Sequence, residues 1–196
     1  MTAKLHITTI TPIAITTVAL IPNLFFSEII IAGLAIGVLF PDIDEKNSYI
    51  SRKLFILYWI IALLRQILSI ALLIVYIFNK TLYERLKNIT EHRGITHYLL
   101  FPVVLFLISF RLPTIAGLFV AAMAVGWLIH ELGDACTYGG IEAWLFPFCT
   151  KTFWVLPRIL RFRTGQSEAF IFLLFFLLDI FLTFHWGLVA KPASFL

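Results

Sequence analysis

Five long apolar stretches, separated by polar connections, run along the chain. They cover residues 7–21, 29–40, 54–78, 98–129 and 169–189, and Arg111 and Pro113 divide the fourth. A bilayer is spanned by about 20 apolar residues in a helix, so these stretches predict membrane helices. The shorter ones extend into the connections or cross a locally thinned bilayer. The pattern predicts an all-α, polytopic membrane helical bundle, with residues 1–196 forming a single domain.

Composition strengthens this interpretation. Apolar residues make up 61% of the 196 residues and charged residues only 13%, and the mean hydropathy is +0.97. Soluble domains carry about 25% charged residues, so this chain has too few to cover a water-facing surface. Lys4 is the only early basic residue and no small-residue cleavage site follows. We therefore expect the first stretch to remain as a membrane helix rather than to be cleaved as a signal peptide.

The distribution of basic residues predicts the orientation. Most lysines and arginines fall in the N-terminal segment and in the connections 41–53, 79–97 and 131–168, whereas Arg111 is the only one in the opposing connections 22–28 and 111–113. The positive-inside rule places the basic connections in the cytoplasm. The net charge of +4 then favours contact with anionic membrane lipid over nucleic-acid binding.

The stretch 54–78 does not fit this alternation as a single crossing, which would invert everything after it. It also carries Arg65 and Gln66 near its middle, where a charge costs about 2.5–3.5 kcal/mol on insertion scales. We therefore predict a hairpin, or a pair of interfacial helices, that enters and leaves from the same side.

Chemically capable side chains gather where the apolar stretches meet the cytoplasmic connections. Four of the five histidines lie there, and acidic residues occupy matching positions. Antiparallel packing of neighbouring helices brings such ends together at one membrane face. The eight groups are His6, Asp42, Asp44, His92, His97, His130, Asp134 and Glu168.

The spacing of these groups suits metal binding. His130 and Asp134 are four residues apart and share one helix face, while Asp42 and Asp44 alternate in a turn that follows a helix end. Imidazole and carboxylate ligands suit zinc, or manganese and iron when oxygen ligands dominate. Because eight donors exceed the needs of one tetrahedral zinc, the sequence predicts two or three divalent ions per chain.

Taken singly, these groups have ordinary explanations. His6 suits an interfacial side chain, Asp42 and Asp44 suit loop acids or caps, and Glu168 suits an acid at a helix start. Asp179, in the middle of the last stretch, implies a buried partner or a functional relay, and Arg65 and Arg111 are both candidate partners. We assign no chemical role to three further residues: His185 is structural, and Cys136 and Cys149 are reduced thiols.

The ordered motifs together resemble the YdjM-like family of inner-membrane metal-dependent hydrolases, also described as LexA-binding or LexA-regulated. The resemblance covers most of the chain and rests on His6, FPDIDEKNS at 40–48, HRGITH at 92–97, HELGDACTYGG at 130–140 and RTGQSE at 163–168. It implies a helical fold related to the phospholipase C and P1 nuclease group, in the bacterial inner membrane. The implied ligands coincide with the eight groups above, and Arg93 and Thr96 match a pattern that contacts phosphate or neighbouring carboxylates.

The expected activity is hydrolysis of a phosphoester or a lipid-like ester by a metal cluster that faces the cytoplasm. Asp42 or Asp44 is expected to orient or deprotonate the nucleophile, and Arg93 to neutralise charge on the phosphoryl oxygens. A site at the headgroup level favours an amphiphilic or phosphorylated small molecule, and three tryptophans near this face suit interfacial anchors: Trp127, Trp144 and Trp154.

Two other functions remain open. A metal-ion or proton transporter also uses histidines and carboxylates within membrane segments, but its ligands belong near mid-membrane. A non-catalytic regulatory membrane scaffold needs no intact ligand set. The sequence carries no feature that fixes the oligomeric state.

Overall fold

The computed structural model describes residues 2–87, 95–146, 148–164 and 168–188. Within these ranges most of the chain is helical and no strand is formed. The segment after Ala135 contains two isolated β-bridges. The elements are α1 (Ala3–Leu20), α2 (Leu24–Leu39), η1 (Phe40–Asp44), α3 (Tyr49–Lys53), α4 (Phe55–Phe78), α5 (Lys80–Leu86), η3 (Ile95–His97), α6 (Leu100–Ser109), α7 (Thr114–Ala135), η4 (Arg158–Leu160) and α8 (Glu168–His185).

The predicted all-α polytopic bundle is confirmed. Five of the described helices are long and apolar enough to cross a membrane: α1, α2 with its η1 extension, α4, α7 and α8. The predicted division of the fourth apolar stretch is also confirmed, because α6 ends at Ser109 and α7 begins at Thr114 after Pro113. α6 has only 10 residues, about 15 Å of helix, which is shorter than the hydrocarbon core of a bilayer.

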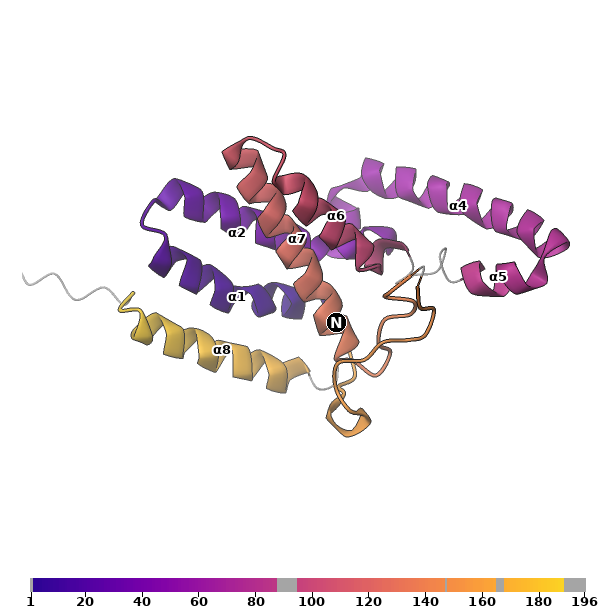
Figure 1. The fold of residues 1–196 in the computed structure, drawn as a ribbon. Helices are drawn as coiled ribbons and strands as arrows, with labels where there is room; N and C mark the ends of the chain where they lie inside the picture. The colour runs from indigo at the N-terminus through magenta and orange to yellow at the C-terminus, as the bar shows by residue number, and fades with distance from the viewer. Residues whose placement is uncertain (1, 88–94, 147, 165–167, 189–196) are drawn as a thin grey trace, which may run out of the picture.

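The packing of α2 against α7 forms the centre of the bundle (Figure 1). Glycines allow the close approach of the two backbones: a Cβ atom on Gly37 would overlap the backbone of Met123, and one on Gly126 would lie 2.9 Å from the Val38 nitrogen. Small residues at helix interfaces serve this purpose in membranes, where van der Waals contact between helices replaces a hydrophobic driving force. Leu34, also on α2, is buried beside these glycines.

The structure overturns the predicted form of residues 54–78. Residues 55–78 form one unbroken 24-residue helix, α4, with Leu54 as its N-cap, and the stretch is neither a hairpin nor a pair of helices. The chain turns only after Phe78, where Asn79 accepts a hydrogen bond from the Leu82 N–H at 2.9 Å and caps α5. In Figure 1, α4 extends away from α1, α2 and α8, with α5 beside its far end. Whether α4 crosses the bilayer or lies along its surface stays a prediction.

Arg65 and Gln66, which suggested a break in this helix, instead lie on the polar side of α4. Arg65 Nη1 donates to the Asp44 carbonyl at 3.0 Å, and Tyr58 and Ser69 line the same small pocket. Residues at such helical spacing share one face, so the helix keeps its polar groups on the side that meets η1.

Helix α8 packs against α1, and its mid-helix acid explains part of that contact (Figure 1). The Thr11 hydroxyl lies 2.5 Å from Asp179 Oδ2, so the partner of Asp179 is neither Arg65 nor Arg111. The Thr11 hydroxyl also lies 2.8 Å from the Thr8 carbonyl, which lacks its usual helical donor because Pro12 has no N–H. The contact therefore joins the two helices where Pro12 removes one backbone hydrogen bond from α1.

The segment between α7 and α8 is more than a polar connection. Ile141 and Trp144 are buried and pack against Ala135 at the end of α7. Backbone hydrogen bonds tie this segment to neighbouring elements, from Leu99 N to the Trp144 carbonyl and from Val155 N to the Ala135 carbonyl, both at 3.1 Å. The segment thus covers the α7 end that carries His130 and Asp134.

Candidate metal centre

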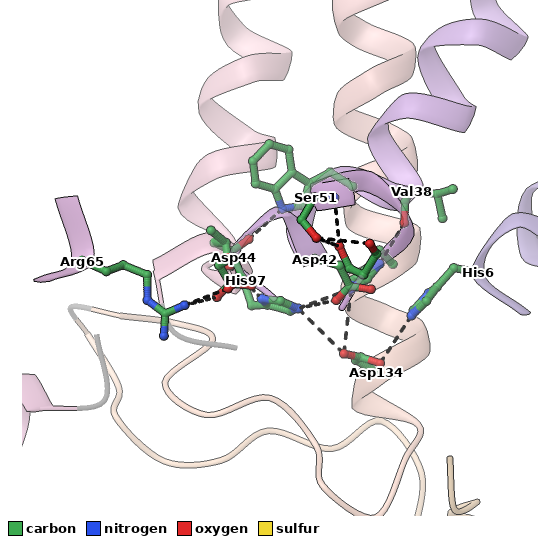
Figure 2. A network of polar contacts seen from close by, with 12 residues as sticks. His6, Val38, Asp42, Asp44, Ser51, Arg65, His97 and Asp134 are labelled. Carbon is green, nitrogen blue, oxygen red and sulfur yellow. Dashed lines mark hydrogen bonds and ion pairs between the residues drawn. The ribbon is translucent and has the colours of Figure 1, made fainter. Parts of the chain in front are cut away.

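Five side chains from four elements converge at one end of the bundle (Figure 2). Two groups in the described part of the chain have ligand atoms within 4.8 Å of one another: His6, His130 and Asp134, and Asp42, His97 and His130. The prediction that distant helix ends bring histidines and carboxylates together is confirmed for these five residues. His6, His97, His130 and Asp134 are at most 1% exposed, so an apolar shell excludes water from most of the cluster.

His130 is oriented by the α2–α7 packing itself. Its Nδ1 lies 2.8 Å from the carbonyl oxygen of Val38. A carbonyl can only accept, so Nδ1 carries the proton and the Nε2 lone pair faces the cluster. Gly126 lies one helical turn before His130 on α7, and it allows the backbone of α7 to approach that of α2 at Val38. The close backbone approach therefore fixes both the position and the tautomer of this histidine, as metal-ligating histidines require.

His97 is held by the short turn that precedes α6. Its Nδ1 lies 3.1 Å from the Thr96 hydroxyl, and the indole N–H of Trp127 donates to the Thr96 carbonyl at 3.0 Å. Thr96 therefore contacts the ring nitrogen of His97 that faces away from the cluster. Trp127 is 5% exposed and supports this turn, so its predicted role as an interfacial anchor is wrong.

Asp134 lies between the two groups (Figure 2). Its Oδ1 is 3.6 Å from His6 Nε2, and its Oδ2 is 3.8 Å from both His97 Nε2 and His130 Nε2. Asp134 thus turns one carboxylate oxygen towards His6 and the other towards His97 and His130. A carboxylate with this orientation would offer one oxygen to each of two cation positions.

The donor atoms have the spacing that a bound cation needs. Two ligands held at about 2.1 Å from a tetrahedral zinc lie about 3.4 Å apart. His97 Nε2 and His130 Nε2 are 3.3 Å apart, and Asp42 Oδ1 lies 3.6 Å from His130 Nε2 and 4.0 Å from His97 Nε2. Asp42, His97 and His130 thus supply three donors around one position, and Asp134 Oδ2 lies beside the two histidines of this set.

His6 supports a second position. Neither of its ring nitrogens has a hydrogen-bond partner among the described residues, although buried polar atoms are nearly always paired. Its ring stacks on that of His130 at 3.8 Å between centroids. Because His130 has only one nitrogen free for a cation, the two groups cannot both use it. His6 Nε2 and Asp134 Oδ1 therefore form a partial second site, so the donor set fits divalent metal.

Comparison with known proteins gives a family for this arrangement. The sequence matches the family described as YdjM inner membrane protein over residues 1–191. The chain belongs to this family. No curated protein and no solved structure matches it. The family description agrees with the apolar helices in assigning the protein to the inner membrane and names no reaction, so the chemistry rests on the site.

Two predicted ligands of this YdjM-family protein lie outside the two donor groups. Asp44 is 3.5 Å from Arg65 Nη1 in an ion pair, which supports the turn that carries Asp42. Glu168 accepts from the Thr2 backbone N–H at 2.9 Å and from its hydroxyl at 2.7 Å, so it ties the start of α8 to the start of α1. The predicted ligand His92 and the predicted phosphate-binding Arg93 lie outside the described residues.

Sequence reasoning missed Glu131, which is fully buried beside the cluster. Its Oε2 accepts from the indole N–H of Trp144 at 2.7 Å, so Trp144 is also a buried support rather than an interfacial anchor. The HELGD motif pointed to this burial, because Glu131 lies between the candidate ligands His130 and Asp134. A buried carboxylate needs a hydrogen-bond donor.

Two other polar groups of this YdjM-family protein near the cluster stay neutral. Burial raises the pKa of Tyr98, the neighbour of His97, to about 12. Burial also raises the pKa of the Cys136 thiol above its usual value, which disfavours the thiolate that binds metal. The cluster therefore depends on imidazole and carboxylate donors, as predicted from the sequence.

Proposed function

We propose that this protein is a membrane-bound, metal-dependent hydrolase that acts on a phosphoester of an amphiphilic substrate. One observation carries the proposal: the donors of Asp42, His97 and His130 lie within 4.8 Å of one another, and Asp134 turns one oxygen towards the two histidines and the other towards His6. Divalent ions held by these residues would polarise the oxygens of a phosphoryl group.

The surroundings of each residue indicate its role in metal binding or in catalysis. Asp42, His97, His130 and Asp134 would hold one divalent ion, and His6 with Asp134 would contribute to a second. Such ions supply Lewis acidity and lower the pKa of water towards about 7. Asp42, whose side chain is 19% exposed while that of His97 is 0% exposed, lies at the open edge of the cluster. It is therefore the carboxylate best placed to orient or deprotonate an incoming nucleophile.

The position of the cluster supports an amphiphilic substrate. The donors lie at the start of α1, the end of α2 and the end of α7, and the ends of membrane-spanning helices are expected near the lipid headgroups. The same end carries the basic residues Arg52, Lys53 and Arg158, and by the positive-inside rule such residues favour a cytoplasmic position. A phosphate ester there can reach the ions while its apolar part stays in lipid.

The transporter alternative receives less support. Its ligands belong along a path through the membrane, whereas the donors described here gather at one end. The mid-span acid Asp179 is half-buried and contacts the Thr11 hydroxyl of the neighbouring helix, a contact between two helices rather than a chain of ligands. A scaffold that has lost its chemistry has no need for donors at metal-binding distances.

A direct test measures hydrolysis by the purified protein in detergent. The protein would be loaded with zinc or manganese and assayed on bis(p-nitrophenyl) phosphate and on phosphatidylglycerol in mixed micelles. We expect metal-dependent turnover that falls by at least about a hundredfold in His97→Gln and Asp134→Asn, since even residues that only support ligands cost 10–100-fold. Glu28→Gln, an exposed acid at the other end of α2, is the matched control. Full metal content without turnover on either ester would contradict the proposal and favour transport or a scaffold.

A further inference from the structure

A groove of about 640 Å³ lies between α7, α8 and the segment before α8. Its walls are mostly apolar and include Leu132, Leu156, Leu160, Phe170, Leu174 and Phe175. This volume lies within the range of sites that enclose small molecules. The donor cluster does not line it, so the groove is a separate feature of the molecule.

The groove exists because α8 has a single close neighbour among the long helices. Helix α8 packs on α1, and its described residues are all at least partly exposed. The chain after α7 then crosses from Leu156 to Phe162 and closes one end of the space between α7 and α8. In a bilayer this leaves an apolar recess beside the helices, open to lipid.

The closed end of the groove carries a positioned cation. Arg161 lines the groove, and its guanidinium carbon lies 4.3 Å from the centre of the Trp154 ring. Its Nε donates to the Leu156 carbonyl at 2.9 Å, which leaves the two terminal amino groups as donors. No described carboxylate pairs with it. A stacked and tethered guanidinium of this kind is suited to a phosphate oxygen pair.

The groove and the cluster share two helices at the same end of the bundle. Gly133 lines the groove and precedes the ligand Asp134 on α7, while Thr9 lines it one turn after His6 on α1. The Thr9 hydroxyl donates to the His6 carbonyl at 2.7 Å. A molecule with its apolar part in the groove thus has its polar part at the level of the cluster.

We infer that this groove binds a phosphate-bearing anionic lipid of the bilayer, with acyl chain against α7 and α8 and phosphate on Arg161. The charge argues for an anionic headgroup, because basic recesses between membrane helices on the cytoplasmic side select such lipids. The inference rests on the proposed function in one respect: it names a glycerophospholipid as the class of molecule presented to the cluster. Binding itself can be measured whether or not hydrolysis occurs.

The test measures retention of palmitoyl-oleoyl phosphatidylglycerol by delipidated protein, using native mass spectrometry, with the phosphatidylcholine of the same chains as comparison. Arg161→Ala is compared with Arg158→Ala, an exposed arginine of the same segment that does not line the groove. Ile171→Trp, which fills the groove, is compared with Phe172→Trp on the next, outward-facing position of α8.

We expect phosphatidylglycerol to bind more tightly than phosphatidylcholine, and Arg161→Ala to weaken its binding about tenfold, the loss of one charge-assisted contact. Ile171→Trp should weaken both lipids, and neither control variant should change them. Equal retention of the two lipids, or an Arg161→Ala variant that binds phosphatidylglycerol like the wild type, would overturn the inference. Metal content measured on the same samples reports separately on the cluster, so a failed hydrolysis assay leaves this result readable.

Discussion

Helices α7 and α4 are both apolar and long enough to cross a membrane, yet they occupy opposite environments. Helix α7 packs against α2 and α6 and has nine buried residues between Gly117 and Ala135. Helix α4 buries Leu72 alone and meets the bundle through η1 and α3. The two helices show that hydrophobicity identifies a membrane helix without saying whether it packs on another helix.

The difference follows from small residues rather than from apolar ones. Helix α7 carries Gly117 and Gly126 where backbones of neighbouring elements come within contact distance, whereas α4 contains no glycine. In lipid, close backbone approach drives association, because apolar side chains gain little by leaving lipid for another helix. The site forms on the helix that can approach its neighbour.

The largest expected effect comes from a side chain that prevents the close approach of α2 and α7. Gly126→Leu places a side chain against the Leu34 carbonyl and the Val38 nitrogen, so α2 and α7 must separate. We predict a loss of stability of about 3 kcal/mol or more, at the upper end of overpacking costs, together with loss of bound metal. Thermal unfolding in detergent and metal analysis measure both effects.

The control for this change is Val125→Leu, at the neighbouring, more exposed position of α7. It should unfold at the wild-type temperature. A Gly126→Leu protein as stable as this control would mean that the two helices do not touch as described.

An intermediate effect is expected where α4 meets the site. Arg65→Leu leaves the buried Asp44 carboxylate, 1% exposed, without its guanidinium partner, which is itself 24% exposed. Removing one partner of a fully buried pair costs about 3–5 kcal/mol, and the partial exposure of Arg65 reduces this to about 2 kcal/mol. Chemical denaturation in detergent measures the change.

A double-mutant cycle separates this pair from other effects of the arginine. Arg65→Leu combined with Asp44→Asn should recover part of the lost stability, since no charge is then left buried. Additive losses in the double variant would show that the two side chains do not interact.

The smallest effect is expected on the outward side of α4. Leu63→Ala and Ile67→Ala remove side chains that are 62% and 55% exposed. Neither contacts the bundle core, so both should change stability by no more than about 0.5 kcal/mol. Losses of 2 kcal/mol or more in the same unfolding assay would mean that α4 packs against the bundle, and the contrast with α7 would fail.

Much of the fold followed from the apolar pattern alone. The helical class and the break near Pro113 depend on local hydrophobicity and on a proline, and the structure confirms both. The form of residues 54–78 was predicted wrongly, because Arg65 was treated as a charge in lipid. Its partner Asp44 lies 21 positions earlier in the chain, and only tertiary packing brings the two together.

The residues of the site were likewise predicted only in part. His6, Asp42, His97, His130 and Asp134 were predicted from their positions at helix ends, since antiparallel helices must gather such ends. The sequence could not separate Asp44 or Glu168 from these candidate ligands, because a carboxylate available to a cation has the same sequence pattern as one that pairs with Arg65 or accepts from the Thr2 N–H. The roles of the indole groups depend on contacts between segments far apart in sequence.

Bound metal in the purified protein tests the central claim most directly. Inductively coupled plasma mass spectrometry would compare the wild type with His97→Ala and Asp134→Ala, and with His185→Ala, a histidine of α8 outside the donor groups. The account predicts two or three zinc, manganese or iron ions per chain in the wild type and His185→Ala, and their loss in the other two variants. A wild type without metal after expression in metal-replete medium, or metal retained in both cluster variants, would contradict it.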